Sequence, residues 1–351
     1  MIKKILIFGA SGFIGFHLSK HLSKNLNNHL TLVDDNSRGQ LDNDFKKLLK
    51  KKNVKFLKLD LTKQKSFRKL EKKYDTLYML ASVVGVNNTL SRPDKVIEIN
   101  TLIIINTLIW LKKNLVKKVL FSSTSENYAG TIDMFKGKIP TPESIPLTIS
   151  DITHPRFTYA ATKILGESAF VNFSKVWGFK VKVVRFHNIF GPRMGFKHAI
   201  PHLIERFYNN ESPFKIYGPN QTRAFCFIDD AVKGIVKLMN SSKAKSEIYN
   251  IGSSQEVRIE KITKTIGQLF NYKGKYIEAK PFPGSTTRRC PDLKKSKKDF
   301  KYKNNFNLSK GMKITFDWYI DYFKKNKKIF EKSYQAPDEF KNVYKIYKKT
   351  N

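Results

Sequence analysis

Residues 4–34 read KILIFGASGFIGFHLSKHLSKNLNNHLTLVD, and this stretch decides the fold of the chain. Residues 4–8 form a short apolar run, which is typical of a buried strand, and residues 13–26 have the length and periodicity of a helix. Residues 30–33 then have the pattern of a second strand. A strand, a glycine-rich turn, a helix and another strand together predict a βαβ unit, from which parallel sheets are built.

The turn between the first strand and the helix has the pattern G-x-x-G-x-x-G, formed by Gly9, Gly12 and Gly15. Glycines at these positions allow a tight turn and let the backbone approach a pyrophosphate closely. The start of the following helix offers free N–H groups and a favourable dipole. We therefore expect this turn, together with Phe13 and Ile14 inside it, to bind a dinucleotide.

Asp34 ends the second strand, about 20 residues beyond the turn, where a carboxylate can accept a hydrogen bond from the adenosine ribose. The same negative charge would repel a 2′-phosphate, so the sequence favours NAD over NADP. Two alternatives stay open at this point. Asp34 could only cap a turn, and the nearby Arg38 could attract a phosphate instead.

Outward from this unit, apolar runs continue to alternate with longer amphipathic stretches. Strands are predicted at residues 54–59, 76–80, 118–122 and 180–186, and a helix at residues 96–113. This order predicts an α/β fold with a doubly wound parallel sheet that is covered on both faces. Beyond residue 186, Gly and Pro punctuate shorter elements, which indicates a smaller second lobe. We expect domains at 1–185 (rejoined by about 225–252), at 186–224 and 253–320, and a basic extension at 321–351.

Composition and charge limit the possible functions of the 351 residues. The chain is 40% hydrophobic, which permits a sizeable core, and its net charge is +37. Only 11 of its 66 basic residues are arginines, and the lysines are spread along the chain, so we interpret the charge as a compositional bias. We expect no nucleic-acid partner.

Membrane and disulfide signals are weak in this sequence. No apolar run reaches the ~18–20 residues that a membrane span needs. The only cysteines are Cys226 and Cys290, which favours a reducing compartment, and we expect a cytoplasmic protein.

Residues 159–163 read YAATK and place Tyr159 and Lys163 four positions apart. On a helix these two side chains share one face. A lysine held there lowers the pKa of the tyrosine electrostatically, so that its phenolate can accept a proton from a hydroxyl group. This pattern predicts a catalytic base.

Residues 121–126 read FSSTSE and end a predicted buried strand. Hydroxyl groups at the carboxyl edge of a parallel sheet point into the crevice where ligands bind, so Ser122, Thr124 and Ser125 are candidate site residues together with Glu126. The alternative is a Ser/Thr turn that only caps the next helix.

Taken together, these three motifs resemble the extended short-chain dehydrogenase/reductase family, the NAD-dependent nucleotide-sugar epimerases and dehydratases. The resemblance extends from about Lys3 to Tyr319. It is also carried by Asp60-Leu61, Leu80-Ala81-Ser82 and Asn100, and by residues 185–193 (RFHNIFGPR), 221–225 (QTRAF) and 288–292 (RRCPD). It implies a Rossmann-like sheet with a smaller C-terminal substrate-binding lobe.

The resemblance implies a role for each matching residue. Tyr159 would remove a sugar hydroxyl proton at C4, Lys163 would bind the nicotinamide ribose, and Thr124 would bind the same sugar hydroxyl; Ser125 and Glu126 complete the catalytic candidates. The cofactor contacts implied are Gly9, Gly12, Phe13, Ile14, Gly15, Asp34, Asp60, Leu61, Leu80, Ala81, Ser82, Asn100, Ser122 and Lys163. The substrate contacts implied are Thr124, Asn188, Arg223 and Arg289, with no metal. A homodimer is implied through helices at residues 96–113 and 155–177.

The exact reaction is less determined by the motifs. The T-S-E at Thr124 to Glu126 matches UDP-glucuronate decarboxylases, but the Y-D-x-G-K-R of that family is Y-A-A-T-K here. Ser125 stands where 4,6-dehydratases carry an acid, which disfavours dehydration. We therefore rank a nucleotide-sugar 4-epimerase of surface-polysaccharide synthesis first, a decarboxylase second and a nucleotide-heptose C4 dehydrogenase third. A non-catalytic RNA-binding or redox-sensing protein is last, because Tyr159 and Lys163 are both intact.

Overall fold

A seven-stranded parallel sheet is the centre of the computed structural model, which describes residues 2–39, 41–245, 247–282 and 284–326. The strand order is β11-β6-β5-β4-β1-β2-β3, and neighbouring strands pair in parallel. The strands are β1 (Lys3–Phe8), β2 (Asn28–Asp34), β3 (Val54–Lys58), β4 (Lys73–Met79), β5 (Leu115–Thr124), β6 (Lys180–Phe186) and β11 (Ile248–Ile251). The predicted doubly wound α/β fold is confirmed.

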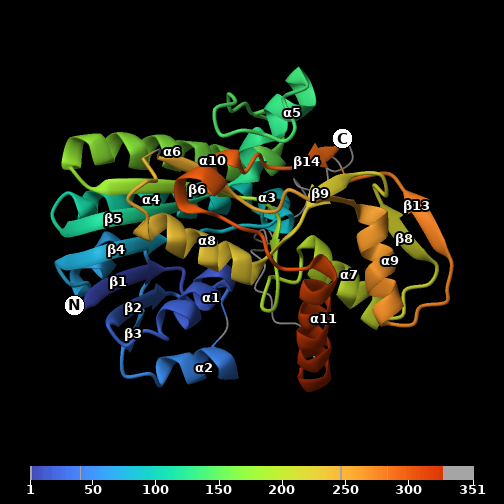
Figure 1. Ribbon diagram of the computed structural model, residues 1–351, viewed down its shortest axis with the longest axis horizontal. Coiled ribbons are helices and arrows are strands. Elements are labelled where there is room, and N and C mark those ends of the chain that lie inside the picture. Colours follow the sequence, from blue (N-terminus) through green and yellow to red (C-terminus); the bar gives the residue numbers. More distant parts are fainter. Residues whose placement is uncertain (1, 40, 246, 283, 327–351) are drawn as a thin grey trace, which may run out of the picture.

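Side chains of the strands are buried on both faces of this sheet, as the apolar runs predict. Successive residues of a strand point to opposite faces. Ile5 and Ile7 therefore join one hydrophobic cluster, with α1 (Phe13–Leu22) and α8 (Ile228–Asn240), and Leu6 and Phe8 join another, with α4 (Pro93–Leu111) and α6 (Thr158–Trp177). Figure 1 shows these helices on opposite sides of the sheet.

Helix ends differ from the predicted ones for local reasons. The helix predicted at residues 13–26 ends at Leu22, and the one predicted at 96–113 begins at Pro93, since proline is favoured in the first turn of a helix. The helix predicted at 155–177 is divided into a short 3₁₀ helix, η3 (Pro155–Phe157), and α6. Gly178 ends α6 in a left-handed conformation with φ 77°.

Shorter elements surround this core. They are α2 (Asn43–Leu49), η1 (Gln64–Lys69), α3 (Val86–Ser91), η2 (Ser125–Tyr128), α5 (Ala129–Phe135) and α10 (Lys294–Phe300). A second lobe, at the right in Figure 1, contains α7 (Ala199–Tyr208), α9 (Ile259–Leu269), α11 (Leu308–Lys325) and the paired strands β8 (Phe214–Tyr217) and β13 (Tyr276–Ala279). Two small sheets complete the chain's described part: β7 (Ile189–Phe190) with β10 (Cys226–Phe227), and β12 (Glu256–Arg258), β9 (Thr222–Ala224) and β14 (Arg288–Arg289).

The C-terminal helix α11 is part of the packed lobe. Its residues Tyr319 and Phe323 are buried, and both rings lie against Phe196. The basic extension predicted to start at residue 321 is therefore wrong for its first residues, because α11 continues to Lys325. The rest of that extension, 327–351, lies outside the described residues.

The same residue ranges also bear on membrane spans, metal ligands and the state of the cysteines. No helix within them is both long and apolar enough to cross a membrane. Among these residues, no three His, Cys, Asp or Glu side chains are grouped as ligands of a metal ion would be. Cys226 and Cys290 are buried, and both are free thiols.

Candidate active site

A cleft of about 720 Å³ lies at the carboxyl ends of the strands, where the order of the sheet reverses between β1 and β4. Ligands of open α/β sheets bind at this point. Most of the predicted site residues line the cleft: Gly9, Gly12, Phe13, Ile14, Gly15, Asp34, Asp60, Leu61, Leu80, Ala81, Ser82, Ser122, Thr124, Ser125, Glu126, Tyr159, Lys163, Asn188 and Arg289. Asn100 and Arg223 do not line it.

The glycine turn forms a cradle with no room for side chains. Gly9 has φ +78°, and a Cβ on it would lie 2.6 Å from the backbone nitrogen of Ala81. A Cβ on Gly15 would lie 2.0 Å from the Gly9 carbonyl oxygen. The carboxylate of Asp34 lines the cleft beside this turn. A closely packed glycine turn that opens on the cleft next to a carboxylate fits a dinucleotide.

Asp34 connects this cradle to the loop after β2. Its carboxylate accepts hydrogen bonds from the backbone N–H of Ser11 (3.0 Å) and of Asn36 (2.8 Å). Burial raises the pKa of Asp34, and these two donors oppose the shift by stabilising the charged form. The carboxylate is thereby held at the end of β2, beside the cleft, where the sequence analysis predicted a ribose contact.

Asn100, predicted to contact the cofactor, lies behind the cleft instead. Its side-chain oxygen accepts from the Val83 backbone N–H (2.7 Å) and from the Ser82 hydroxyl (3.1 Å), and its amide donates to the Thr162 hydroxyl (3.3 Å). These bonds fix the loop after β4 to α6. Asn100 therefore shapes the wall of the cleft from behind, because all its polar atoms are used by protein partners.

The end of β5 faces the catalytic candidates on α6. Lys163 Nζ donates to the backbone carbonyl of Ser122 at 2.8 Å and lies 5.7 Å from the centre of the Tyr159 ring. The Thr124 hydroxyl accepts a hydrogen bond from the backbone N–H of Glu126 (3.2 Å) and lies near enough to the Tyr159 phenol to oppose the rise of its pKa. The structure thus brings together the hydroxyl, the phenol and the ammonium group that the sequence motifs predicted.

The protonation of these groups differs from the prediction. Burial raises the pKa of Tyr159, and the negative charge of Glu126 adds to the rise. Burial lowers the pKa of Lys163 to about 7, although the Glu167 carboxylate opposes this shift. The predicted lowering of the tyrosine pKa by Lys163 is therefore wrong for this arrangement, since desolvation dominates and the ammonium group is bonded to a carbonyl.

Glu126 forms a two-pronged ion pair with Arg289. The guanidinium donates to the two carboxylate oxygens at 2.8 and 3.1 Å. Burial alone would raise the pKa of Glu126, but the charges of Arg289, Arg156 and Arg223 lower it to about 2. Glu126 is therefore an ionised carboxylate inside a positively charged cluster.

Arg223 stands opposite Arg289 because β9 and β14 pair in parallel. Its guanidinium donates to the Thr222 carbonyl (2.8 Å) and the Ser285 hydroxyl (3.1 Å), so it is set back from the cleft. Burial lowers its pKa to about 9, and the positive charges of Arg289 and Arg156 contribute. The charges of these three arginines act on two carboxylates, Glu126 and Asp133, and the remaining positive charge favours an anionic ligand.

Several cleft residues were missed by the sequence analysis. Arg156 lies three positions before Tyr159, and this spacing was the available signal. Arg193 pairs with Asp42 and donates to the Ser11 carbonyl (3.3 Å), which ties the glycine turn to the second lobe. Trp318 comes from α11, far along the chain, and no local pattern marks it.

Asn188, a predicted substrate contact, does lie in the cleft with an available donor. Its backbone has φ 43°, a conformation that few residues other than glycine adopt. Its side-chain nitrogen is buried and makes no hydrogen bond within the described ranges. A strained backbone and an unsatisfied amide at one residue are typical of a ligand contact.

Comparison with known proteins places this geometry in context. The model of the NAD dependent epimerase/dehydratase family matches residues 5–252. A UDP-N-acetyl-alpha-D-glucosaminuronate decarboxylase of Bacillus cytotoxicus is 30% identical, covering 91% of this chain and 98% of its own length. A putative UDP-glucose 4-epimerase of Methanocaldococcus jannaschii is 26% identical, covering 90% and 97%.

A solved structure shares the fold. It is a variant of UDP-glucuronic acid 4-epimerase from Bacillus cereus in complex with UDP-4-deoxy-4-fluoro-glucuronic acid and NAD. It is 24% identical, has a TM-score of 0.80, and the match covers 91% of this chain and 99% of that one. At this identity the similarity concerns the fold alone.

Proposed function

Because the chain belongs to the NAD-dependent epimerase/dehydratase family, we propose that it is a nucleotide-sugar 4-epimerase that works through transient oxidation at C4. The observation that carries this proposal is that Thr124, Tyr159 and Lys163 line the same cleft as the glycine turn, with the Lys163 ammonium group 5.7 Å from the centre of the Tyr159 ring. NAD is the cofactor of this family, and when bound it would accept a hydride from the sugar.

The chain's own residues perform the remaining tasks. The cradle around Gly9, Gly15 and Asp34 would hold the dinucleotide, with Lys163 reaching its nicotinamide ribose. Tyr159 is placed to accept the proton of the C4 hydroxyl, and the neighbouring Thr124 hydroxyl to orient that group. After rotation of the 4-keto sugar turns its opposite face to the returning hydride, the same tyrosine would give the proton back to the C4 oxygen.

A second candidate, decarboxylation of a nucleotide uronic acid, is favoured by Glu126 and Arg289. Glu126, two residues beyond Thr124, and its ion-pair partner Arg289 add a carboxylate and a guanidinium to the groups that a simple epimerase needs. The Bacillus cytotoxicus relative, 30% identical, is a decarboxylase by name. Both candidates share the oxidation at C4, which would make the sugar carboxylate of a uronic acid easier to lose as carbon dioxide.

The arginine cluster favours a uronic acid for either reaction. Arg156 and Arg289 line the cleft, and Arg223 lies beside Arg289 on the neighbouring strand. Guanidinium groups bind carboxylates through paired, charge-assisted hydrogen bonds. We therefore infer that the substrate is a UDP-linked sugar with a carboxyl group at C6.

A binding experiment tests this substrate. Calorimetry would compare UDP-glucose with UDP-glucuronic acid for the wild type, for Arg156→Met and for Arg258→Met; Arg258, an exposed arginine of β12, serves as control. If Arg156 binds the uronic carboxylate, Arg156→Met weakens only UDP-glucuronic acid, by roughly tenfold or more. Equal weakening of both ligands would assign Arg156 to the diphosphate, and tighter binding of UDP-glucose by the wild type would contradict a uronic acid.

The assembly and location of the enzyme remain part of the proposal. Exposed apolar side chains lie along α4 and α6, namely Ile97, Leu102, Ile105 and Leu165. α4 packs beside α6 on one face of the sheet (Figure 1), so a second copy could cover both helices in a four-helix interface. A cytoplasmic homodimer that supplies surface-polysaccharide precursors fits these features and the two free cysteines.

A further inference from the structure

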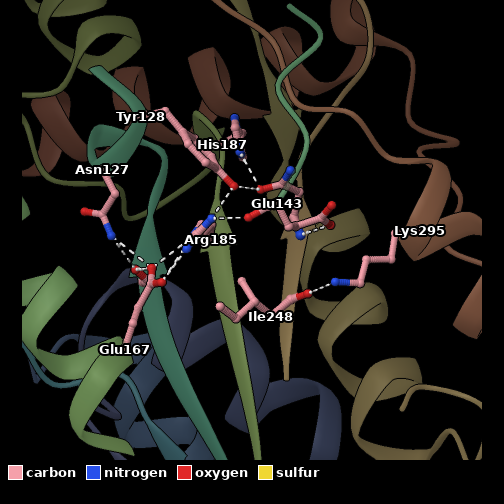
Figure 2. Close-up of polar contacts among 10 residues, drawn as sticks. Asn127, Tyr128, Glu143, Glu167, Arg185, His187, Ile248 and Lys295 are labelled. Atoms are coloured by element: carbon pink, nitrogen blue, oxygen red, sulfur yellow. Dashed lines mark hydrogen bonds and ion pairs between the residues drawn. The ribbon is translucent and has the colours of Figure 1, made fainter. Parts of the chain in front are cut away.

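A buried polar network lies directly behind the catalytic candidates, and Glu167 is its centre (Figure 2). The Glu167 side chain is 6% exposed and accepts hydrogen bonds from the Ser123 hydroxyl (2.5 Å) and the Asn127 amide (2.9 Å). Arg185 donates to both of its oxygens, at 2.9 and 2.6 Å. Every oxygen of this carboxylate is therefore used, and none of the roles above involves it.

Two consecutive residues of β5 are bonded to two successive turns of α6. The Ser122 carbonyl accepts from Lys163, and the Ser123 hydroxyl donates to Glu167. Tyr159, Lys163 and Glu167 are spaced four residues apart, so they lie on one face of the helix. The Ser123 bond therefore fixes the end of β5 against α6, next to the bond that holds Lys163.

The network continues from Arg185 toward the second lobe. Arg185 Nη1 donates to the Tyr128 hydroxyl (2.8 Å) and to the backbone carbonyl of Glu143 (3.0 Å). The Tyr128 hydroxyl donates in turn to Asn250 (2.9 Å), whose amide reaches the Thr141 carbonyl at 3.0 Å. Figure 2 shows this chain of contacts running from α6 across β6 to β11.

We propose that Glu167 is a positioning residue that holds the end of β5 against α6 through Ser123 and places a negative charge one helical turn beyond Lys163. The inference rests on the proposed function only in taking Tyr159 and Lys163 as the reacting pair. Glu167 acts through Ser123 and through its charge, and does not touch the substrate.

The charges around Glu167 and Lys163 support the electrostatic part. β6 contributes the Arg185 cation, η2 contributes the Tyr128 phenol, and α6 contributes Tyr159; α4 reaches this face through the uncharged Asn100. Behind Tyr128 lies His187, whose pKa burial lowers to about 3, so it is neutral. Replacing Glu167 by glutamine would remove the carboxylate whose charge favours the protonated form of Lys163.

The first test measures Lys163 directly. The pH dependence of Lys163 acetylation, followed by peptide mass spectrometry, gives its pKa without any substrate. Glu167→Gln should lower this pKa from its value of about 7 by about one unit, as expected for losing an opposite charge at close range. The basic limb of the activity profile should move to lower pH by the same amount. Glu260→Gln, which breaks an exposed ion pair with Lys264, should leave both unchanged.

The second test separates the positioning of β5 from the charge of Glu167. It uses a variant that leaves the buried Arg185 paired with Glu167. Ser123→Ala keeps the ion pair of Glu167 and Arg185 but removes the bond to β5. We expect kcat to fall by about tenfold with an unchanged KM and an unchanged Lys163 pKa, because only the register is loosened. A purely structural role would lower the melting temperature alone.

Two results would overturn the inference. One is a Lys163 pKa in Glu167→Gln equal to that of the wild type; the other is a kcat in Ser123→Ala within twofold of the wild type. If Glu167→Gln does not fold, the kcat of Ser123→Ala alone tests the inference. Failure of the proposed function would look different, since the acetylation shift would remain while no nucleotide sugar is converted.

Discussion

At the scale of single residues, Asp34 is the side chain that should select the cofactor. It accepts two backbone N–H groups and lines the cleft at the end of β2. Asp34→Ala should weaken NAD by roughly 10- to 100-fold, the range for losing hydrogen bonds to a charged group, and should relax the discrimination against NADP. Fluorescence titration with both dinucleotides checks this. Tighter binding of NADP than of NAD by the wild type would show that Asp34 does not bind the adenosine ribose.

The ion pair of Glu126 and Arg289 makes a prediction about pH. The folded-state pKa of Glu126, about 2, is below its ordinary value of 4.5, so the charged form stabilises the fold. This contribution is complete above pH 4.5 and is lost as the pH falls toward 2. Chemical denaturation should therefore show the wild type losing stability over this window more steeply than Glu126→Gln. Parallel curves for the two proteins would mean that the pair does not stabilise the folded state.

Sequence reasoning found the residues of this site whose chemistry is local. Tyr159 and Lys163 are four positions apart on one helix, and Thr124 follows directly from the end of a strand. Glu167 and Arg156 were missed, because the groups they act on, Arg185 and Glu126, lie on other elements. Their spacing from Tyr159 marks them only weakly, and the pairings form only when the elements pack together.

At the scale of elements, the turn between β1 and α1 is the least tolerant of added atoms. A Cβ on Gly15 would lie 2.0 Å from the Gly9 carbonyl oxygen, while a Cβ on Gly12 would lie 3.3 Å from the same oxygen. Gly15→Ala should therefore cost about 1–3 kcal/mol of unfolding free energy and most of the NAD affinity.

Gly12→Ala is the matched comparison for this turn. It should reduce stability less, since its Cβ needs only a small shift of the neighbouring carbonyl. Thermal unfolding of both variants, with and without NAD, measures the difference. Equal melting temperatures for Gly15→Ala and the wild type would contradict the close contact between Gly15 and the Gly9 carbonyl.

The order of the elements was predictable and their ends were less so. Apolar runs identified β1, β5 and β6, but β5 extends from Leu115 to Thr124 and not only over 118–122. Its first residues include lysines, and backbone pairing with β4 extends the strand to them in spite of their polarity. The second lobe has short strands such as β9 and β14, which depend on each other for pairing and leave little trace in the sequence.

At the scale of the whole molecule, the exposed apolar face of α4 and α6 predicts a dimer. Ile105 and Leu165 are 39% and 43% exposed, and other exposed apolar side chains lie on the same two helices. Several exposed apolar side chains on one surface indicate an interface. Light scattering after size exclusion should give twice the chain mass at micromolar concentration. Ile105→Glu with Leu165→Glu should give monomers, because each introduces a charge into the covered face. A wild type that elutes as a monomer would argue against the interface.

The central claim is that this chain oxidises a nucleotide sugar at C4 and that Tyr159 is the base. The most direct test is to incubate the NAD-loaded protein with UDP-glucuronic acid deuterated at C4 and to follow the products by NMR. We expect a C4 epimer, or a pentose with release of carbon dioxide, in either case with deuterium retained at C4. Tyr159→Phe should keep its fold and its NAD while turnover falls by roughly 10² to 10⁴. Loss of deuterium to solvent, or near wild-type turnover by Tyr159→Phe, would contradict the account.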